Sequence, residues 1–268
     1  MAVTASKFAE LVERVAPLSC AYDWDNSGMT LRQHDKIEKV FLSLDINRRA
    51  LDEALAQQCD TILSHHPLLF AAQKKFDRIS PVEDLFLQAV HANLNLYAAH
   101  TSFDCAPGGM NDLLARQMGL KRIRPLMVLE TSAGRISRVM GAIGEYEEAL
   151  EPEKFAEKLK RDFGLPYVKM SRGRGAIQKV ACVGGAGSEF LPQAALEGAD
   201  AFVTGEVKHN CFAEAQVLGI ALVEAGHYDT EKIFISGMRE GLQKAQNELE
   251  CNIEVICPRG QARPYEFC

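Results

Sequence analysis

A pattern of apolar strands with polar endpoints occurs twice along this chain of 268 residues. The segment KVFLSLD at 39–45 corresponds to KVACVGG at 179–185, and QCDTILSHH at 58–66 corresponds to GADAFVTGE at 198–206. The interval from Lys39 to Asp60 equals the interval from Lys179 to Asp200, 21 residues in both halves. Because the interval and the polar endpoints agree together, the pattern favours a duplication over a chance likeness of two α/β units.

A third pair of segments extends the repeat to residues with chemical function. IALVEAGHYDTE at 220–231 corresponds to LNLYAAHTSFD at 94–104, which aligns His100 with His227 and Asp104 with Glu231. Each histidine is followed four residues later by a carboxylate. Strands that alternate with helical stretches predict an α/β fold with two similar lobes, whose mixed, largely parallel sheets are flanked by helices.

The repeat sets the expected domain boundaries. We expect a first α/β lobe at residues 1–125, a short middle α/β segment at 126–176 and a second lobe at 177–268, packed on the first. In the middle segment we expect a strand within 135–146, a helix beginning at Pro152 and a strand within 165–171. The middle segment is short, so we expect a compact form of the fold in which this segment packs on the body of the chain as a short insert.

Composition and charge exclude several classes of protein. A hydrophobic content of 47% is that of a globular chain, and the net charge of −6 without a basic run argues against a broad nucleic-acid surface. The first 17 residues lack a signal-peptide pattern, and no apolar stretch approaches the ~20 residues of a membrane span. We therefore expect a soluble, cytoplasmic protein.

The eight cysteines form no CxxC pair. In a chain without an export signal, scattered cysteines are usually small buried hydrophobic residues, and we interpret these in the same way. Cys105 is of further interest only because it adjoins Asp104.

Five of the seven histidines lie at strand ends or in the loops that follow: His65, His66, His100, His209 and His227. In α/β sheets these ends border the crevice where ligands bind. The pair His65–His66 could direct two imidazoles into one pocket if the strand ends there, but would point to opposite faces if the strand continued. Pro67 interrupts the strand and favours the first arrangement.

The two histidine–carboxylate pairs favour a metal site. In HTSFD and HYDTE the spacing of four residues brings both side chains to one face of a helix. Mixed imidazole and carboxylate ligands suit zinc, manganese or iron. The predicted ligands are too many for one open zinc site and suit two divalent ions, with Glu231 as a bridge: His65, His66, Asp104, His227 and Glu231. The alternative is that they are surface polar groups and loop caps.

Two glycine-containing turns allow a structural or a functional interpretation. The loop CVGGAGS at 182–188 could hold a phosphate on its backbone amides, and WDNSG at 24–28 could direct Asp25 toward the pocket. Neither loop has a phosphate-binding consensus, and both compositions suit tight turns. We favour the turn interpretation for both.

Several segments in order resemble the signatures of the GTP cyclohydrolase 1 type 2 family, also called Nif-three-like: DNSGMTL at 25–31, LSHHPLLF at 63–70, HTSFDCAPGGMND at 100–112, GEVKHN at 205–210 and EAGHYDTE at 224–231. The resemblance implies that the five predicted ligands form a dinuclear centre. It also implies a hexameric ring whose sites face an internal cavity. HTSFD replaces the usual HTNLD and GEVKHN replaces GDVKYH, which displaces His209 from the family position and leaves it out of the ligand set.

The predicted pocket suits a hydrolase in which divalent ions activate water. His100 and Glu206 are the candidate catalytic residues for proton transfer, although His100 could instead cap a loop. The resemblance implies opening of the guanine ring of GTP with release of formate. A metal-dependent phosphoesterase would use the same pocket, and a metal-binding scaffold or regulatory protein without turnover is the alternative from another class.

Overall fold

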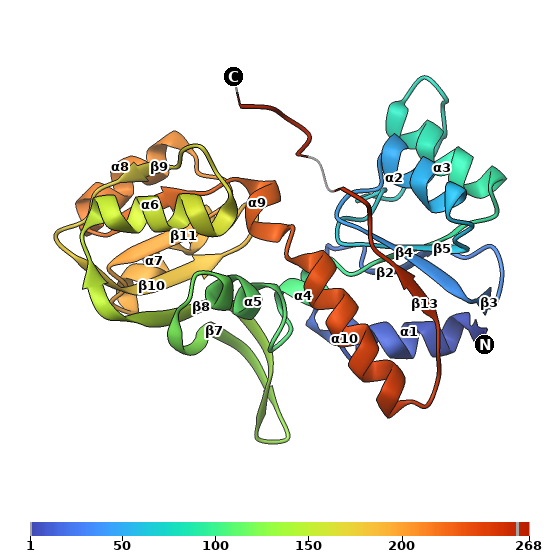
Figure 1. Ribbon diagram of the computed structural model, residues 1–268, viewed down its shortest axis with the longest axis horizontal. Coiled ribbons are helices and arrows are strands. Elements are labelled where there is room, and N and C mark those ends of the chain that lie inside the picture. Colours follow the sequence, from blue (N-terminus) through green and yellow to red (C-terminus); the bar gives the residue numbers. More distant parts are fainter. Residues whose placement is uncertain (1, 261–262, 268) are drawn as a thin grey trace. The chain divides into compact units, whose positions relative to one another are not determined.

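The computed structural model describes residues 2–260 and 263–267 (Figure 1). The chain divides into two compact units. Unit 1 comprises residues 1–106 and 234–261, and unit 2 comprises residues 107–233 and 262–268. Each unit contains its own mixed sheet with flanking helices, so the α/β fold predicted from the sequence is confirmed.

The sheet of unit 1 has five strands in the order β13 (Glu254–Ile256), β4 (Lys39–Ser43), β5 (Thr61–Ser64), β6 (Asn95–Ala98) and β2 (Gly28–Leu31). The first four run parallel, and β2 pairs antiparallel with β6. A separate antiparallel pair joins β1 (Val3–Thr4) to β3 (Lys36–Ile37). The parallel strands β4, β5 and β6 therefore end at one edge, where the histidines follow.

Helices cover both faces of this sheet (Figure 1). On one face α2 (Arg48–Ala56) and α3 (Pro81–His91) pack on a buried cluster that includes Phe41, Ile62 and Leu96. On the other face lie α1 (Ala5–Glu13) and α10 (Phe234–Glu248), and Phe8 of α1 contacts Tyr97 edge to face at 5.7 Å. The short elements η1 (Leu18–Cys20) and α4 (Thr101–Asp104) complete unit 1.

The sheet of unit 2 has six strands in the order β7 (Lys121–Ser132), β8 (Arg135–Leu150), β10 (Ile177–Val183), β11 (Ala201–Thr204), β12 (Ala221–Glu224) and β9 (Lys169–Ser171). The central strands β10, β11 and β12 are parallel, and the remaining pairs are antiparallel. The arrangement β10–β11–β12 repeats the arrangement β4–β5–β6 of unit 1.

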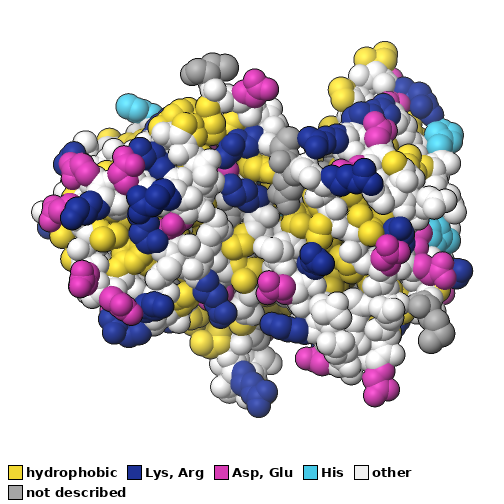
Figure 2. All heavy atoms as spheres, in the orientation of Figure 1, with side chains coloured by type: hydrophobic (Ala, Val, Ile, Leu, Met, Phe, Trp, Pro, Cys, Tyr) yellow, Lys and Arg dark blue, Asp and Glu magenta, His cyan; other side chains and the backbone are white. Residues whose placement is uncertain are grey.

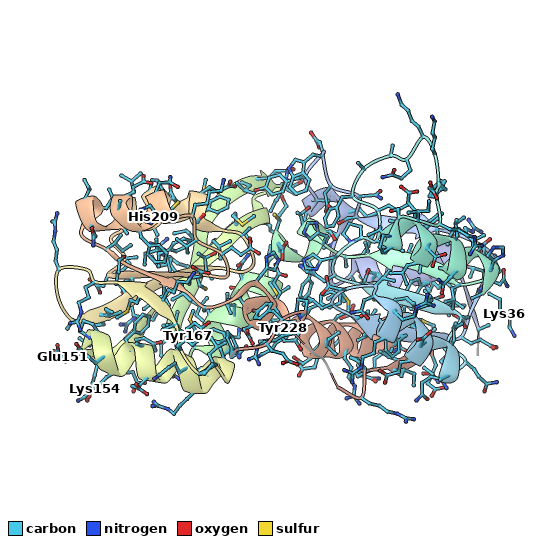
Figure 3. The ribbon with its side chains drawn as sticks, turned by 90° about the horizontal axis from the view of Figure 1, so that it is seen from above. Lys36, Glu151, Lys154, Tyr167, His209 and Tyr228 are labelled. Carbon is cyan, nitrogen blue, oxygen red and sulfur yellow. The ribbon has the colours of Figure 1, made fainter. Side chains whose placement is uncertain are left out.

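Helices also flank the second sheet. α5 (Met110–Gln117) and α6 (Pro152–Phe163) contribute to one buried cluster, with Phe155, Leu159 and Phe163 as the apolar face of α6. Figure 3 shows α6 near Glu151 and Lys154 on one side of the sheet and α8 (His209–Leu218) on the other. The short elements η2 (Ser188–Phe190), α7 (Leu191–Leu196) and α9 (His227–Glu231) follow β10 and β12.

The equal interval in the two halves has a structural cause. Asp60 accepts hydrogen bonds from the amides of Glu38 and Lys39, at 2.7 and 2.8 Å. Asp200 does the same for Gln178 and Lys179, at 3.0 and 2.8 Å. Each aspartate therefore joins the start of one strand to the start of its parallel neighbour, and the two pairs lie at matching positions of the repeat.

The C-terminal part of the chain is shared between the units. Residues 234–261 belong to unit 1, because α10 packs on α1 and β13 adds a parallel strand beside β4. The boundaries expected from the repeat grouped this stretch with the second lobe. The expected middle segment 126–176 lies inside unit 2, where β8 pairs with β10 and β9 pairs with β12. Its strands extend the repeated sheet on both sides.

The surface of the described residues carries charges of both signs, and most of the cysteines are buried. On the face in Figure 2, acidic and basic side chains are interspersed over both units. No helix among the described residues is long and apolar enough to cross a membrane. Five of the cysteines are buried, and burial raises the pKa of Cys59 to about 11, as for a small hydrophobic residue. Cys268 lies outside the described residues.

Candidate metal centre

Three imidazoles gather at the carboxyl end of the unit 1 sheet. His65 and His66 follow β5, and His100 follows β6. Their ring centroids are 4.8 to 5.4 Å apart, and one ligand nitrogen from each lies within 4.8 Å of the others. His65 is fully buried, whereas His66 and His100 are partly exposed. This group could hold a metal ion.

The strand ends before the histidine pair, as Pro67 predicted. The successive amides of His65 and His66 both donate toward the β4 segment, to the carbonyls of Ser43 and Leu44, each at 3.0 Å. In a regular strand successive amides point to opposite sides, so the strand geometry is broken here. The two rings lie close together, with centroids 4.8 Å apart, and do not point to opposite faces.

Each ring of the cluster is oriented through its Nδ1 atom. His65 Nδ1 lies 2.9 Å from the carbonyl oxygen of Ala99, and His66 Nδ1 lies 2.8 Å from Asp45 Oδ1. Because these oxygens only accept, Nδ1 carries a proton, and in the neutral ring Nε2 is then the nitrogen with the lone pair. Histidines that bind metals have this second hydrogen bond almost always, and it fixes both tautomer and ring direction.

Asp25 orients His100 in the same way. Its Oδ1 lies 2.7 Å from His100 Nδ1, while Oδ2 accepts from the hydroxyls of Ser27 and Thr101, both at 2.6 Å. The Asp25 side chain is fully buried. Burial alone would raise its pKa, but the hydrogen bonds, that with His100 first, hold the pKa well below its usual value of 3.8. Asp25 is therefore an ionised partner of His100.

Asp104 completes the predicted residues of unit 1. It ends α4, four residues after His100, and its Oδ1 lies 3.7 Å from His65 Nε2. The structure thus brings His65, His66, His100 and Asp104 together, and Asp104 presents its carboxylate to the imidazole of His65.

The predicted residues of unit 2 lie on α9. His227 begins this helix and Glu231 ends it, so the four-residue spacing places them on one face, as the sequence predicted. His227 Nε2 lies 3.0 Å from Glu231 Oε2, and His227 Nδ1 lies 2.7 Å from Glu206 Oε1. Glu206 therefore orients His227 as Asp25 orients His100. Glu231 is nearly fully buried, whereas the Glu206 side chain is 60% exposed.

The glycine loop after β10 supports Glu231. The Gly185 amide donates to Thr230 Oγ1 at 3.1 Å, and its carbonyl accepts from the amides of Gly205 and Glu206 at 2.8 and 3.0 Å. A Cβ atom at Gly185 would collide with Glu231 Oε1 and lie 3.2 Å from His227 Nε2. The loop is a turn, as its composition favoured, and its glycine permits a close approach to the predicted ligand.

The other side of α9 is anchored by a buried ion pair. Asp229 accepts from Arg263 Nε and Nη2 at 2.9 and 2.8 Å and from Lys232 Nζ at 2.9 Å, and its side chain is fully buried. Arg263 thereby ties the C-terminal segment 263–267 to the helix that carries His227 and Glu231. The label of Tyr228, the residue after His227, marks α9 in Figure 3.

The orienting roles of Asp25 and Asp45 were not predicted from the sequence. The available signals were the DNSG turn, for which the turn interpretation was favoured over a role of Asp25 in the pocket, and Asp45 at the end of KVFLSLD. His209, which was left out of the ligand set, begins α8 and is exposed (Figure 3). The described donors are imidazoles and carboxylates, and a set of this chemistry fits zinc, iron or manganese.

Comparison with known proteins gives one consistent result. The model of the family described as Duf34/NIF3 (NGG1p interacting factor 3) matches residues 3–264. A Clostridium acetobutylicum protein named GTP cyclohydrolase 1 type 2 homolog is 23% identical over 269 residues, covering 100% of both chains. A Nostoc protein of the same name is 30% identical over 197 residues, covering 72% of this chain and 73% of its own.

Solved structures share the fold. A Staphylococcus aureus hypothetical protein is similar with a TM-score of 0.91 and 26% identity, covering 99% of each chain. A Bacillus cereus protein related to NIF3 has a TM-score of 0.90 at 20% identity, with 99% of each chain covered. Reduced HcgD from Methanocaldococcus jannaschii has a TM-score of 0.73 at 26% identity, covering 96% of this chain and 98% of its own.

Proposed function

This chain belongs to the DUF34/NIF3 family, and from that premise we propose that it is a hydrolase that depends on two divalent metal ions and acts on a nucleotide. The relatives named GTP cyclohydrolase 1 type 2 homolog support GTP as the first substrate to test. The buried His and Glu groups of the two units, which could bind metal ions, support the metal requirement.

One observation carries the proposal. In all four histidines of the candidate centre, an oxygen acceptor lies within 2.9 Å of Nδ1, so Nδ1 is the donor nitrogen of each ring. In His227 the other nitrogen, Nε2, lies 3.0 Å from Glu231 Oε2, a second predicted ligand. Loop caps need no such uniform orientation, whereas metal ligands do. We propose that the ions, zinc, iron or manganese, are held by the five predicted ligands: His65, His66, Asp104, His227 and Glu231.

The remaining polar residues have supporting roles in this proposal. Divalent ions in such a set supply Lewis-acid activation of water. His100 accepts and returns a proton at Nε2, and the ionised Asp25 stabilises the imidazolium that forms. Glu206 holds His227 in the tautomer whose Nε2 binds metal, and being largely exposed it can also exchange protons with solvent.

The ligand set is tested by metal content. We expect His66→Ala and Glu231→Ala to lower the metal bound per chain, because each removes one donor. His91→Ala is the matched control. His91 is exposed at the end of α3, and its Nε2 lies 2.7 Å from Arg78 Nη2. Elemental analysis after dialysis measures the outcome. Unchanged metal in both cluster variants would reject the ligand set.

The reaction is tested with the metal-loaded protein and GTP. Release of formate supports the cyclohydrolase activity, whereas release of phosphate without formate assigns a phosphoesterase. If neither product forms across a nucleotide panel, and metal removal abolishes binding to a partner, the protein is a metal-binding scaffold and the hydrolase proposal is wrong.

We also propose that the chain assembles into a hexameric ring, which the family resemblance implies. Light scattering coupled to size-exclusion chromatography gives the solution mass. A mass of six chains of 29.6 kDa is expected. A monomer at micromolar concentration contradicts the assembly without affecting the metal site.

A further inference from the structure

Two large aromatic side chains lie exposed beside His100. Trp24 is 65% exposed and Phe70 is 53% exposed. The ring of Trp24 lies 6.1 Å from the ring of His100 at an interplanar angle of 72°, and that of Phe70 lies 5.5 Å away at 84°. Phe70 also lies 6.4 Å from His66. Both aromatic rings thus contact the imidazole cluster, and both leave most of their surface open to solvent.

Contacts of the neighbouring residues hold Trp24 in place. Tyr22 stacks on Trp24, with ring centroids 5.7 Å apart and planes 11° apart, and its amide donates to Thr101 Oγ1 at 3.0 Å. The next residue after Trp24 is Asp25, whose buried carboxylate joins this turn to His100 and Thr101. Trp24 therefore has one face supported by Tyr22 and a backbone fixed next to the cluster.

A hydrogen bond joins the segment of Trp24 to the segment of Phe70. Asn26 Nδ2 donates to the carbonyl oxygen of Leu69 at 2.6 Å. Asn26 is two residues after Trp24, and Leu69 directly precedes Phe70. The two aromatic residues are 46 positions apart in the sequence, yet this bond ties their backbones together. The structure thus positions two rings that contribute little to the buried core.

We propose that Trp24 and Phe70 form a stacking site for the planar heteroaromatic ring of a substrate, next to His100. This inference rests on the proposed hydrolase function and specifies the part of the substrate that is recognised. Planar bases gain free energy from stacking on aromatic side chains, and both rings have accessible surface next to the imidazoles for such a contact. A ring held here lies against the imidazoles, so the group attached to it is presented to the cluster.

The single tryptophan of the chain provides the assay. Fluorescence excited at the tryptophan band reports on Trp24 alone. Titration with guanosine should quench the emission, whereas ribose 5-phosphate, which has no aromatic ring, should not. Absence of quenching by guanosine and by adenosine at millimolar concentration overturns the proposal.

Variants of Phe70 test the second ring while Trp24 still reports. We expect Phe70→Ala to weaken guanosine binding roughly 5- to 150-fold, the loss that corresponds to one stacked base. Phe70→Tyr keeps the ring and should restore the affinity. Phe76→Ala is the matched control in the same loop, because Phe76 is 44% exposed and stacks on Phe86 instead. Unchanged affinity in Phe70→Ala overturns the proposal.

Two further readouts separate this inference from its alternatives. A change in solution mass on Phe70→Ala would assign the rings to a contact between copies of the chain and overturn the stacking site. Guanosine binding that depends on Phe70, in a protein that hydrolyses nothing, supports the stacking site while the hydrolase proposal fails. Hydrolysis of GTP with an unchanged KM in Phe70→Ala supports the hydrolase proposal and overturns the stacking site.

Discussion

Replacing Gly185 by alanine should weaken metal binding through a single methyl group. Gly185 has a φ of +61°, and a Cβ atom built on it would collide with Glu231 Oε1 and lie 3.2 Å from His227 Nε2. The backbone cannot retreat easily, because the Gly185 amide and carbonyl hold Thr230, Gly205 and Glu206 by hydrogen bonds. The Glu231 carboxylate must therefore move.

The expected magnitudes follow from two separate effects. An L-residue in the left-handed region costs about 1–2 kcal/mol, and overpacking of a buried site costs about 1–3 kcal/mol more. Gly185→Ala should thus lower the free energy of unfolding by roughly 2–5 kcal/mol. Since disturbing the residues around a metal ligand typically reduces metal affinity about 10- to 100-fold, we expect a loss of at least about tenfold.

Two glycine variants in unit 2 separate the effects. Gly134 has a φ of +74°, and a methyl group added there would meet no atom within 4 Å, so Gly134→Ala carries the backbone penalty alone. Gly184 precedes Gly185, and a Cβ added to it would lie 3.4 Å from Met110 Cγ and 3.6 Å from Glu231 Cγ, both ordinary van der Waals contacts that leave the Glu231 carboxylate in place. Both control variants should bind metal as the wild-type protein does.

The assays are denaturant unfolding of the metal-free protein and competition with a chromophoric chelator for the affinity. Wild-type affinity in Gly185→Ala would show that Glu231 does not bind metal from the position found here. An equal loss of affinity in Gly134→Ala would show that reduced stability alone causes the effect, and would refute the geometric argument.

Other substitutions test the surrounding structure. The pKa of Asp25 lies below its usual 3.8, so the ionised carboxylate contributes fully to the stability of the fold above that pH. This contribution is lost as the pH falls from 3.8 toward the lower pKa of the folded state. The difference in unfolding free energy between the wild-type protein and Asp25→Asn should therefore shrink during titration from pH 6 to 3. Asp60→Ala and Asp200→Ala each remove a carboxylate that accepts from two backbone amides. Each should lower the free energy of unfolding by about 1–3 kcal/mol in chemical denaturation, with similar values because the positions are equivalent. Arg263→Ala leaves Asp229 with Lys232 as its one remaining charged partner among the described residues, and the thermal midpoint should fall by several degrees; Arg263→Lys should recover part of it.

Local patterns in the sequence predicted a large part of the fold. The parallel strands β4, β5 and β6 and their counterparts β10, β11 and β12 are continuous apolar runs, and such runs mark buried parallel strands reliably. The spacing of His227 and Glu231 predicted their common helical face. In each case the information lies within a few neighbouring residues.

The partners that orient the histidines could not be predicted in this way. Asp25 and His100 are separated by 75 positions, and Asp45 and His66 by 21. No periodicity in the sequence links such residues. Asp25 precedes β2 and Asp45 follows β4, so each meets its histidine only because the folded sheet brings these strands beside those that precede the histidines. The placement of 234–261 in unit 1 has the same origin, since α10 and β13 join elements near the N-terminus that share no local pattern with them.

The repeat also explains why the two units offer different donors. The alignment that matches His100 with His227 also matches His66 with Glu206. In unit 1 this position carries an imidazole oriented by Asp45, whereas in unit 2 it carries a carboxylate that orients His227. In unit 1 the orienting acid of His100 comes instead from the turn before β2. The two repeated arrangements therefore share the strand ends and the histidine after the third strand, but at the second strand one carries an imidazole and the other carries an orienting carboxylate. This difference leaves unit 2 with His227 and Glu231 as its predicted ligands, fewer than the three protein ligands of a usual catalytic zinc site.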